Sequence, residues 1–261
     1  MAALPPFHLH WDVLLILGTI AIGYRLLEIR FRPPTWHRLS FYGGWALLVI
    51  TSSWPMHDLA EQSLYWIHMV NHMVLTLVAP PLLLLGFSRP MADRLLTRRV
   101  LVWLRPLARP AVAFAIFNFG LIATHWPDIV ALSLRSEIAH FLIHAFLFAS
   151  GLLMWMPIAS PSPLLARIAP PMQLLYLFLN SILPIVPAGF LTFSEIPLYP
   201  AYGDASLAFG LTAVADQTLA GLIMKVVGTM IFWVVMAFIW FRWASEEKRW
   251  DRLEEDLRAR L

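Results

Sequence analysis

The sequence predicts an all-α, polytopic membrane protein with seven transmembrane helices, its N-terminus outside and its C-terminus in the cytoplasm. Of its 261 residues, 59% are hydrophobic and only 13% are charged, a balance that soluble proteins of this length rarely show. Apolar runs of about 15–25 residues recur along the chain, long enough to cross ~30 Å of hydrocarbon as helices. The basic residues gather on one side of these runs, which indicates the orientation.

The expected spans are separated by segments rich in proline and arginine, such as Arg32-Pro33-Pro34 and Ser88-Arg89-Pro90. Nothing in the chain indicates a soluble domain or an internal repeat. We therefore expect one bundle, residues 1–243, and an amphipathic cytoplasmic tail, residues 244–261, whose apolar residues recur at helical spacing among many charges. The spans are expected at 12–30, 40–56, 63–87, 108–125, 136–156, 170–193 and 216–241.

The orientation follows from the 19 Lys and Arg residues. All but two of them flank the first, third and fifth connections or fill the C-terminal tail. The exceptions are Arg135, in a connection on the opposite side, and Lys225, inside the last span. Because basic residues are retained on the cytoplasmic side, the N-terminus is expected outside.

Proline pairs predict bends within two of the spans. Pro80 and Pro81 lie in the inner half of the third span, and Pro184 and Pro187 lie in the sixth. Proline removes a backbone hydrogen bond, so neighbouring helices are expected to satisfy the freed carbonyl groups. We interpret these prolines as determinants of shape and not of chemistry.

All but one of the nine histidines fall on the outer side of the expected bundle, and only His37 lies across it. Ionisable side chains within hydrocarbon are costly, so several at one depth indicate a functional site. Imidazole is the commonest protein ligand of transition metals. The chain has no cysteine, which excludes disulfides and thiolate metal sites. The outer histidines are His8, His10, His57, His68, His72, His125, His140 and His144.

Two histidine pairs carry the prediction of a metal site. His68 and His72 in the third span are four residues apart, so they stack on one helix face about 6 Å apart along the axis. His140 and His144 repeat this spacing in the fifth span. Because both pairs begin from the outer face and reach overlapping depths, we expect all four imidazoles to share one site.

Four further residues are candidate ligands. His57, in the connection before the third span, and His125, at the outer end of the fourth, are expected to bind a metal as it arrives or leaves. Met224 in the seventh span lies level with the histidine pairs and offers a thioether, which suits Cu(I). Asp216 opens that span, and it is a metal ligand, a carboxylate that orients a histidine, or a helix N-cap.

In these residues the chain resembles the CtaG family of cytochrome c oxidase assembly factors, the seven-span Bacillus type. The resemblance implies a role in maturing a haem–copper oxidase in the bacterial inner (plasma) membrane, by handling copper for it. The partners it implies are an oxidase subunit and membrane lipid, and no nucleic acid. The matching stretches are Met56-His57-Asp58-Leu59-Ala60, His68-Met69-Val70-Asn71-His72-Met73, His125-Trp126-Pro127 and Asp216-Gln217, together with His140, His144 and Met224.

The leading hypothesis is an assembly factor that holds copper at the outer face and passes it to an oxidase subunit. A second reading is a b-type haem protein that uses two of the histidines as axial ligands. A third is a metal-free scaffold for oxidase subunits, with the histidines as hydrogen-bonding groups between helices. An enzyme is not expected, because the sequence contains no activated nucleophile and no paired catalytic carboxylates.

Overall fold

The computed structural model describes residues 4–165, 167–202 and 205–259, and these residues form helices without any strand. The all-α prediction is therefore confirmed. The main helices are α1 (Trp11–Phe31), α2 (Thr35–Thr51), α3 (Met56–Gln62), α4 (Tyr65–Met73), α5 (Ala79–Gly86), α6 (Arg89–Leu95), α7 (Arg98–Leu107), α8 (Pro110–Thr124), α9 (Pro127–Arg135), α10 (Glu137–Ala159), α11 (Pro170–Ile182), α12 (Ile185–Phe193), α13 (Ala213–Leu222) and α14 (Gly228–Ala259). Short helical turns connect or interrupt them: η1 (Val74–Val78), η2 (Pro163–Leu165), η3 (Pro200–Tyr202), η4 (Ala205–Phe209) and η5 (Ile223–Val227).

Four helical segments within the described residues are long and apolar enough to cross a membrane. Helices α7 and α8 meet at 68°. Counted together as one bent span, they are also long and apolar enough to cross, which brings the number to five. These segments coincide with the third to seventh expected spans. The four are Tyr65–Gly86, Glu137–Ala159, Pro170–Phe193 and Ala213–Ala259.

The first two expected spans are also helical, as α1 and α2. However, α1 carries Arg25, Glu28 and Arg30 in its second half, and α2 has only 17 residues. Their length and composition do not by themselves indicate membrane crossing, so the total of seven spans stays a prediction, as does the orientation of the termini.

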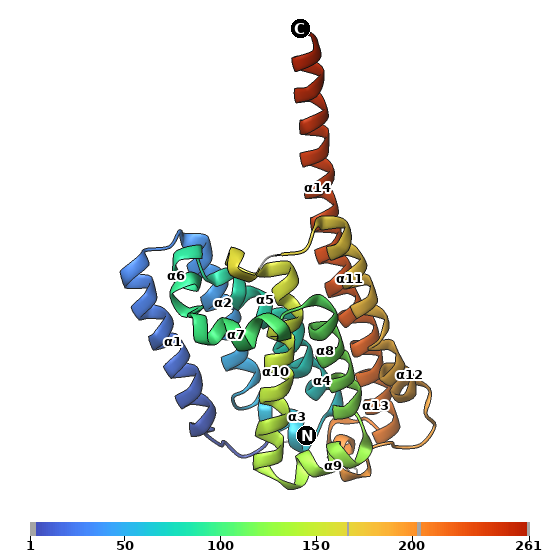
Figure 1. Ribbon diagram of the computed structural model, residues 1–261. Coiled ribbons are helices and arrows are strands. Elements are labelled where there is room, and N and C mark those ends of the chain that lie inside the picture. The colour runs from blue at the N-terminus through green and yellow to red at the C-terminus, as the bar shows by residue number, and fades with distance from the viewer. Residues whose placement is uncertain (1–3, 166, 203–204, 260–261) are drawn as a thin grey trace.

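The helices form a bundle with two dissimilar ends (Figure 1). The segment before α1 lies beside the start of α3, where the Trp54 indole donates a hydrogen bond to the Pro5 carbonyl at 3.0 Å. The loops around α6 and η2 lie at the other end, and the final part of α14 extends beyond the bundle there (Figure 1). Helix α14 passes residue 243 without a break, so the boundary between bundle and tail also stays a prediction.

Small residues bring the central helices close together. A Cβ atom at Gly151 of α10 would lie 2.8 Å from the Thr76 carbonyl oxygen in η1. A Cβ atom at Gly221 of α13 would lie 2.8 Å from the Ala188 carbonyl oxygen in α12. Since a real Cβ does not approach backbone so closely, only glycine allows these contacts. The turn η1 and the start of α5 thus pack directly against α10.

A π-helical turn, η1, interrupts the helix formed by α4 and α5 just before Pro80. Proline has no N–H, so Pro80 leaves the Thr76 carbonyl without its usual helical partner. The Trp155 indole of α10 donates a hydrogen bond to that carbonyl at 3.2 Å. The expectation that a neighbouring helix satisfies a carbonyl freed by proline is met here, and it ties α10 to the helix that carries His68 and His72.

Candidate metal centre

The start of α4 is held in place by a carboxylate from another helix. Both oxygens of Asp216, in α13, accept hydrogen bonds from backbone N–H groups, those of Tyr65 at 2.8 Å and Trp66 at 3.0 Å. The residue that precedes α4, Leu64, offers no capping side chain. The first N–H groups of a helix lack partners within the helix, and this buried carboxylate accepts hydrogen bonds from two of them. Its negative charge also interacts favourably with the positive end of the helix dipole.

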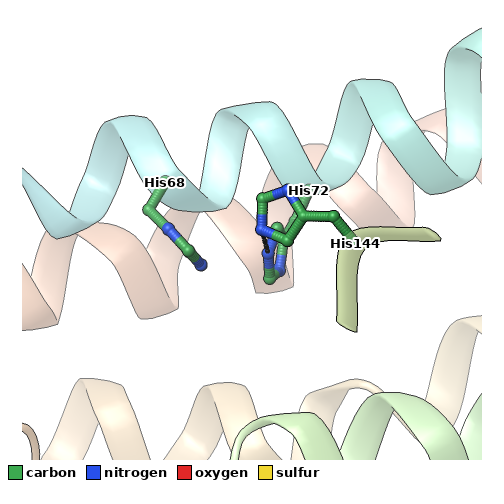
Figure 2. A group of neighbouring side chains, drawn as sticks. All are labelled: His68, His72 and His144. Carbon is green, nitrogen blue, oxygen red and sulfur yellow. Dashed lines mark hydrogen bonds between the residues drawn. The ribbon is translucent and has the colours of Figure 1, made fainter. Parts of the chain in front are cut away.

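Three histidines meet one to two turns further along. His68 and His72 project from α4 towards His144 of α10 (Figure 2). One nitrogen from each of the three rings lies within 4.8 Å of the others. We call these three residues the inner group. His68 and His72 are buried, and His144 is half-buried.

The spacing within the inner group matches that of ligands around one small ion. The Nε2 atoms of His72 and His144 lie 3.3 Å apart. Two nitrogen ligands of one tetrahedral ion are separated by about 3.3 Å when each metal–nitrogen bond is about 2.0 Å. The same separation also permits a hydrogen bond between two neutral imidazoles. The arrangement can therefore exist without a metal and can accept one with little movement.

His125 supplies a further nitrogen beside the inner group. It ends α8 and is buried, with its ring centre 6.1 Å from that of His72. Its Nδ1 donates a hydrogen bond to the Leu121 carbonyl at 2.7 Å, which places the single proton of a neutral ring on Nδ1. Its Nε2 is buried without a hydrogen-bond partner among the described residues. That nitrogen keeps a free lone pair, as in the metal-binding histidines whose other nitrogen bonds to a backbone carbonyl.

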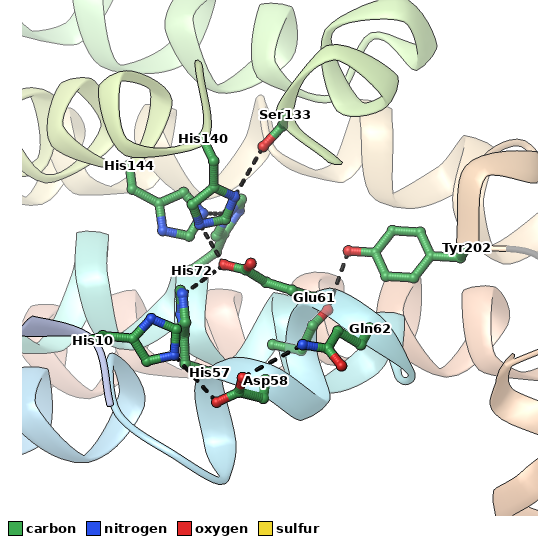
Figure 3. A network of polar contacts seen from close by, with 11 residues as sticks. His10, His57, Asp58, Glu61, Gln62, His72, Ser133, His140, His144 and Tyr202 are labelled. Atoms are coloured by element: carbon green, nitrogen blue, oxygen red, sulfur yellow. Dashed lines mark hydrogen bonds and ion pairs between the residues drawn. The ribbon is translucent and has the colours of Figure 1, made fainter. Parts of the chain in front are cut away.

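A second group adjoins the first, with the ring centres of His140 and His144 4.1 Å apart. The Nε2 atoms of His57, in α3, and His140, in α10, lie 2.7 Å and 2.5 Å from the same oxygen, Oε1 of Glu61 (Figure 3). Burial alone would raise the pKa of the Glu61 carboxyl, but hydrogen bonds from His140 and His57 hold that pKa below its usual range. We call His57, Glu61 and His140 the middle group. Its carboxylate carries a negative charge that the inner group lacks.

A third group, the outer group, consists of His8, His10 and Asp58. His10 Nε2 lies 3.2 Å from Asp58 Oδ2. One potential ligand atom from each of the three residues lies within 4.8 Å of the others. Asp58 is buried at the start of α3, whereas His8 is exposed. The third group thus reaches from the protein interior to its surface.

The structure divides the four histidines that we expected in one site. His68, His72 and His144 form the inner group, but Nε2 of His140 is turned to Glu61 of the middle group. His57 belongs to the middle group, and the ring centre of His125 lies 6.1 Å from that of His72 in the inner group. All six predicted histidines thus lie in one connected region, and none of these contacts tests metal binding itself.

Asp216 and Met224 have other surroundings. Asp216 lies in α13 but caps the neighbouring helix α4. The Thr212 side chain caps α13 itself. Met224 is buried in η5 and lines a small, mainly apolar cavity with Met73 and Phe117. We therefore assign Asp216 a positioning role and leave Met224 out of the ligand set proposed below.

Four residues of the outer and middle groups were not among the predicted ligands, namely His8, His10, Asp58 and Glu61. A sequence signal existed for one of them. His57 and Glu61 are four residues apart, which places both on one face of a helix, and α3 is that helix. For His10 and Asp58 no local signal existed, because 48 residues separate them along the chain.

The capping role of Asp216 predicts an effect on stability. Replacing Asp216 with alanine leaves two N–H groups at the start of α4 without their acceptor, and we expect a loss of about 2 kcal/mol in the free energy of unfolding. Asp216→Asn keeps one acceptor oxygen and should lose less. Thermal unfolding in detergent measures both, with Asp128→Ala as control, since Asp128 is an exposed acidic residue in the first turn of α9. Equal melting of Asp216→Ala and the wild type would contradict the assignment.

One family of known proteins matches most of the chain. A model of the cytochrome c oxidase caa3 assembly factor family, Caa3_CtaG, matches residues 20–246. The chain belongs to this family. The resemblance drawn from the sequence is thereby confirmed, and the match, together with the long apolar helices, indicates a membrane protein that acts in oxidase assembly. No curated protein and no solved structure matches the chain.

The stretch matched by this caa3 assembly factor family contains the whole inner group and the whole middle group. It begins after His8 and His10, so part of the outer group lies before it.

Proposed function

We propose that this assembly factor binds copper in the inner group, with His125 as an additional ligand, and passes the ion to a subunit of a haem–copper oxidase. One observation carries the proposal. Imidazoles from two separate helices converge within the bundle, with the Nε2 atoms of His72 and His144 at the separation of two ligands of one ion. The family supports the assembly role, and the geometry supports a metal ion as the cargo.

The chemistry of the inner group favours copper, in its monovalent state. Imidazole suits copper, zinc, iron and nickel, and a chain without cysteine cannot use thiolates. The three ligands are neutral, and burying a cation among neutral ligands costs less for one charge than for two. Neutral ligands without a carboxylate also release an ion more readily, as transfer to another protein requires.

The short distance between nitrogens favours a small ion over a haem. In a bis-histidine haem the two axial nitrogens lie on opposite sides of the iron, about 4 Å apart, with the porphyrin between them. The Nε2 atoms of His72 and His144 are closer than that. Packing of Gly151 against η1 also keeps α10 and the α4–η1 helix in direct contact.

The proposal includes a place in the cell. With the N-terminus outside, the end of the bundle that carries the three groups faces the periplasm, and the basic loops face the cytoplasm. A multi-pass position in the bacterial inner membrane then presents the copper site to the periplasmic side of an oxidase. The role is one of binding and transfer, with no catalysed reaction.

Copper analysis of the full-length protein, purified in detergent from copper-replete cells, tests the proposed function. We expect at least one copper per chain, with nitrogen ligands in the X-ray absorption spectrum and no Soret band in the visible spectrum. Protein without bound copper that cannot be loaded with Cu(I) would overturn the proposal. A Soret band would replace it with the haem reading, and a metal-free protein that still supports oxidase assembly would replace it with a scaffold.

A further inference from the structure

The inner group is connected to the protein surface by an unbroken series of histidine rings. Consecutive rings contact one another from His144 through the middle group to the segment that precedes α1, where His8 is exposed. Figure 3 shows His10, His57, His140 and His144 along this series. The distances between ring centres are 4.1 Å for His144–His140, 5.5 Å for His140–His57, 4.4 Å for His57–His10 and 4.7 Å for His10–His8.

We propose that the outer group is a separate copper-binding site that captures the ion at the surface, and that the middle group passes it inward. This inference rests on the proposed function, because it adds a capture site and a route to the inner site. Each of the three groups places potential ligand atoms within 4.8 Å of one another, which is sufficient for one ion at a time in each. The ion moves by exchanging one imidazole for the next.

Contacts with neighbouring residues hold the members of the outer group in position. Asp58 is buried, and its Oδ1 accepts a hydrogen bond from Gln62 at 3.4 Å, which leaves Oδ2 directed at His10. Its only ion-pair partner among the described residues is that histidine. The segment that carries His8 and His10 is itself anchored, since Trp54 bonds to the Pro5 carbonyl and its ring packs against Phe7 at 5.5 Å between centres.

Glu61 makes the middle group a transfer point. A single oxygen of its carboxylate faces nitrogens from two different elements, His57 on α3 and His140 on α10. His57 is the neighbour of His10 in the outer group, and His140 is the neighbour of His144 in the inner group. An ion bound beside Glu61 therefore has a ligand from each side within reach.

The charges of the three groups give the route a direction. The outer and middle groups each hold one carboxylate, Asp58 and Glu61, whereas the inner group holds only imidazoles. The buried Asp58 and the half-buried Glu61 attract a cation from solution and offset its loss of hydration at the first two positions. At the last position the ion is held by coordination alone, which suits release to a partner.

Loading experiments on the full-length protein test this route. Cu(I) is supplied anaerobically, the amount bound is measured by equilibrium dialysis, and the rate of loading is measured by competition with a chromogenic Cu(I) chelator. Asp58→Asn and His10→Ala should each remove about one copper per chain and slow loading of the inner site by at least tenfold. Glu61→Gln should also slow loading. The affinity of the inner site at equilibrium should remain that of the wild type in all three.

Matched controls separate the route from general effects of charge. Asp12→Asn and Glu137→Gln each remove an exposed carboxylate near the same end of the bundle and should load at the wild-type rate. Circular dichroism and gel filtration confirm folding, and His10→Ala replaces a partly exposed side chain, so it tests the outer site even if Asp58→Asn unfolds.

The outcomes distinguish this inference from the proposed function. Wild-type protein that binds no Cu(I) would overturn both. Protein that binds Cu(I) in the inner group but whose His10→Ala and Glu61→Gln variants keep the wild-type stoichiometry and loading rate would overturn the route alone. Loss of all bound copper on replacing His72 and His144 would overturn an outer site that binds independently.

Discussion

Replacing both His72 and His144 with alanine is expected to abolish copper binding in the inner group. Two of its three imidazoles are removed, and they are the pair whose Nε2 atoms lie 3.3 Å apart. Loss of a group that only orients a metal ligand already weakens affinity by about 10–100-fold, so loss of two ligands should weaken it by at least about 100-fold. Competition with a Cu(I) chelator measures this change, and oxidase activity in membranes that carry the variant should fall with it.

The control for this double variant is His37→Ala. His37 lies at the opposite end of the bundle, where its Nδ1 lies 2.7 Å from the Leu85 carbonyl oxygen, and it belongs to none of the three groups. It should bind copper like the wild type. If the double variant keeps both its inner-site affinity and its support of oxidase assembly, the inner group does not carry the function.

Replacing Gly151 with valine is expected to destabilise the bundle by about 3 kcal/mol, because overpacking against rigid neighbours forces the backbone to move. The new Cβ would lie 2.8 Å from the Thr76 carbonyl oxygen and 3.1 Å from the Thr76 Cα, and backbone atoms cannot move aside as a flexible side chain can. Displacement of α10 would also separate His144 from His72, so copper affinity should fall along with the melting temperature.

Gly18→Val is the matched control for this substitution. Gly18 is also inside a helix, α1, but a Cβ atom there meets nothing within 4 Å. The control should leave the free energy of unfolding nearly unchanged, because valine forms a helix at least as well as glycine does. Equal thermal unfolding of the two variants would show that close packing of α10 on η1 does not hold the site together.

The helical segments could be predicted from the sequence because their determinants are local. An apolar run long enough to cross a membrane must satisfy its own backbone hydrogen bonds, and a helix does so within the run. The third, fifth, sixth and seventh expected spans therefore reappear as long apolar helices. The breaks in α7–α8 and at η1 follow from prolines, which act on their own helical turn.

The histidine pairs were equally visible in the sequence. Four-residue spacing places His68 above His72, and His140 above His144, on any α-helix. Which nitrogens then meet is a different question, because it depends on how α10 rotates against α4. The packing of Gly151 and the hydrogen bond of Trp155 set that rotation, and the result joins His144 to the inner group while His140 turns to Glu61.

By itself, the sequence determined that this protein is a helical, histidine-rich bundle of the oxidase assembly family, since helix formation and spacing on a helix face depend on neighbours in the chain. Only the tertiary structure decided that Asp216 caps α4, and that His10 and Asp58 extend the series of rings to the surface. These contacts join residues separated by 151 and 48 positions, and no local interaction encodes them. They arise from the packing of whole helices against one another, which the pattern along any single helix does not specify.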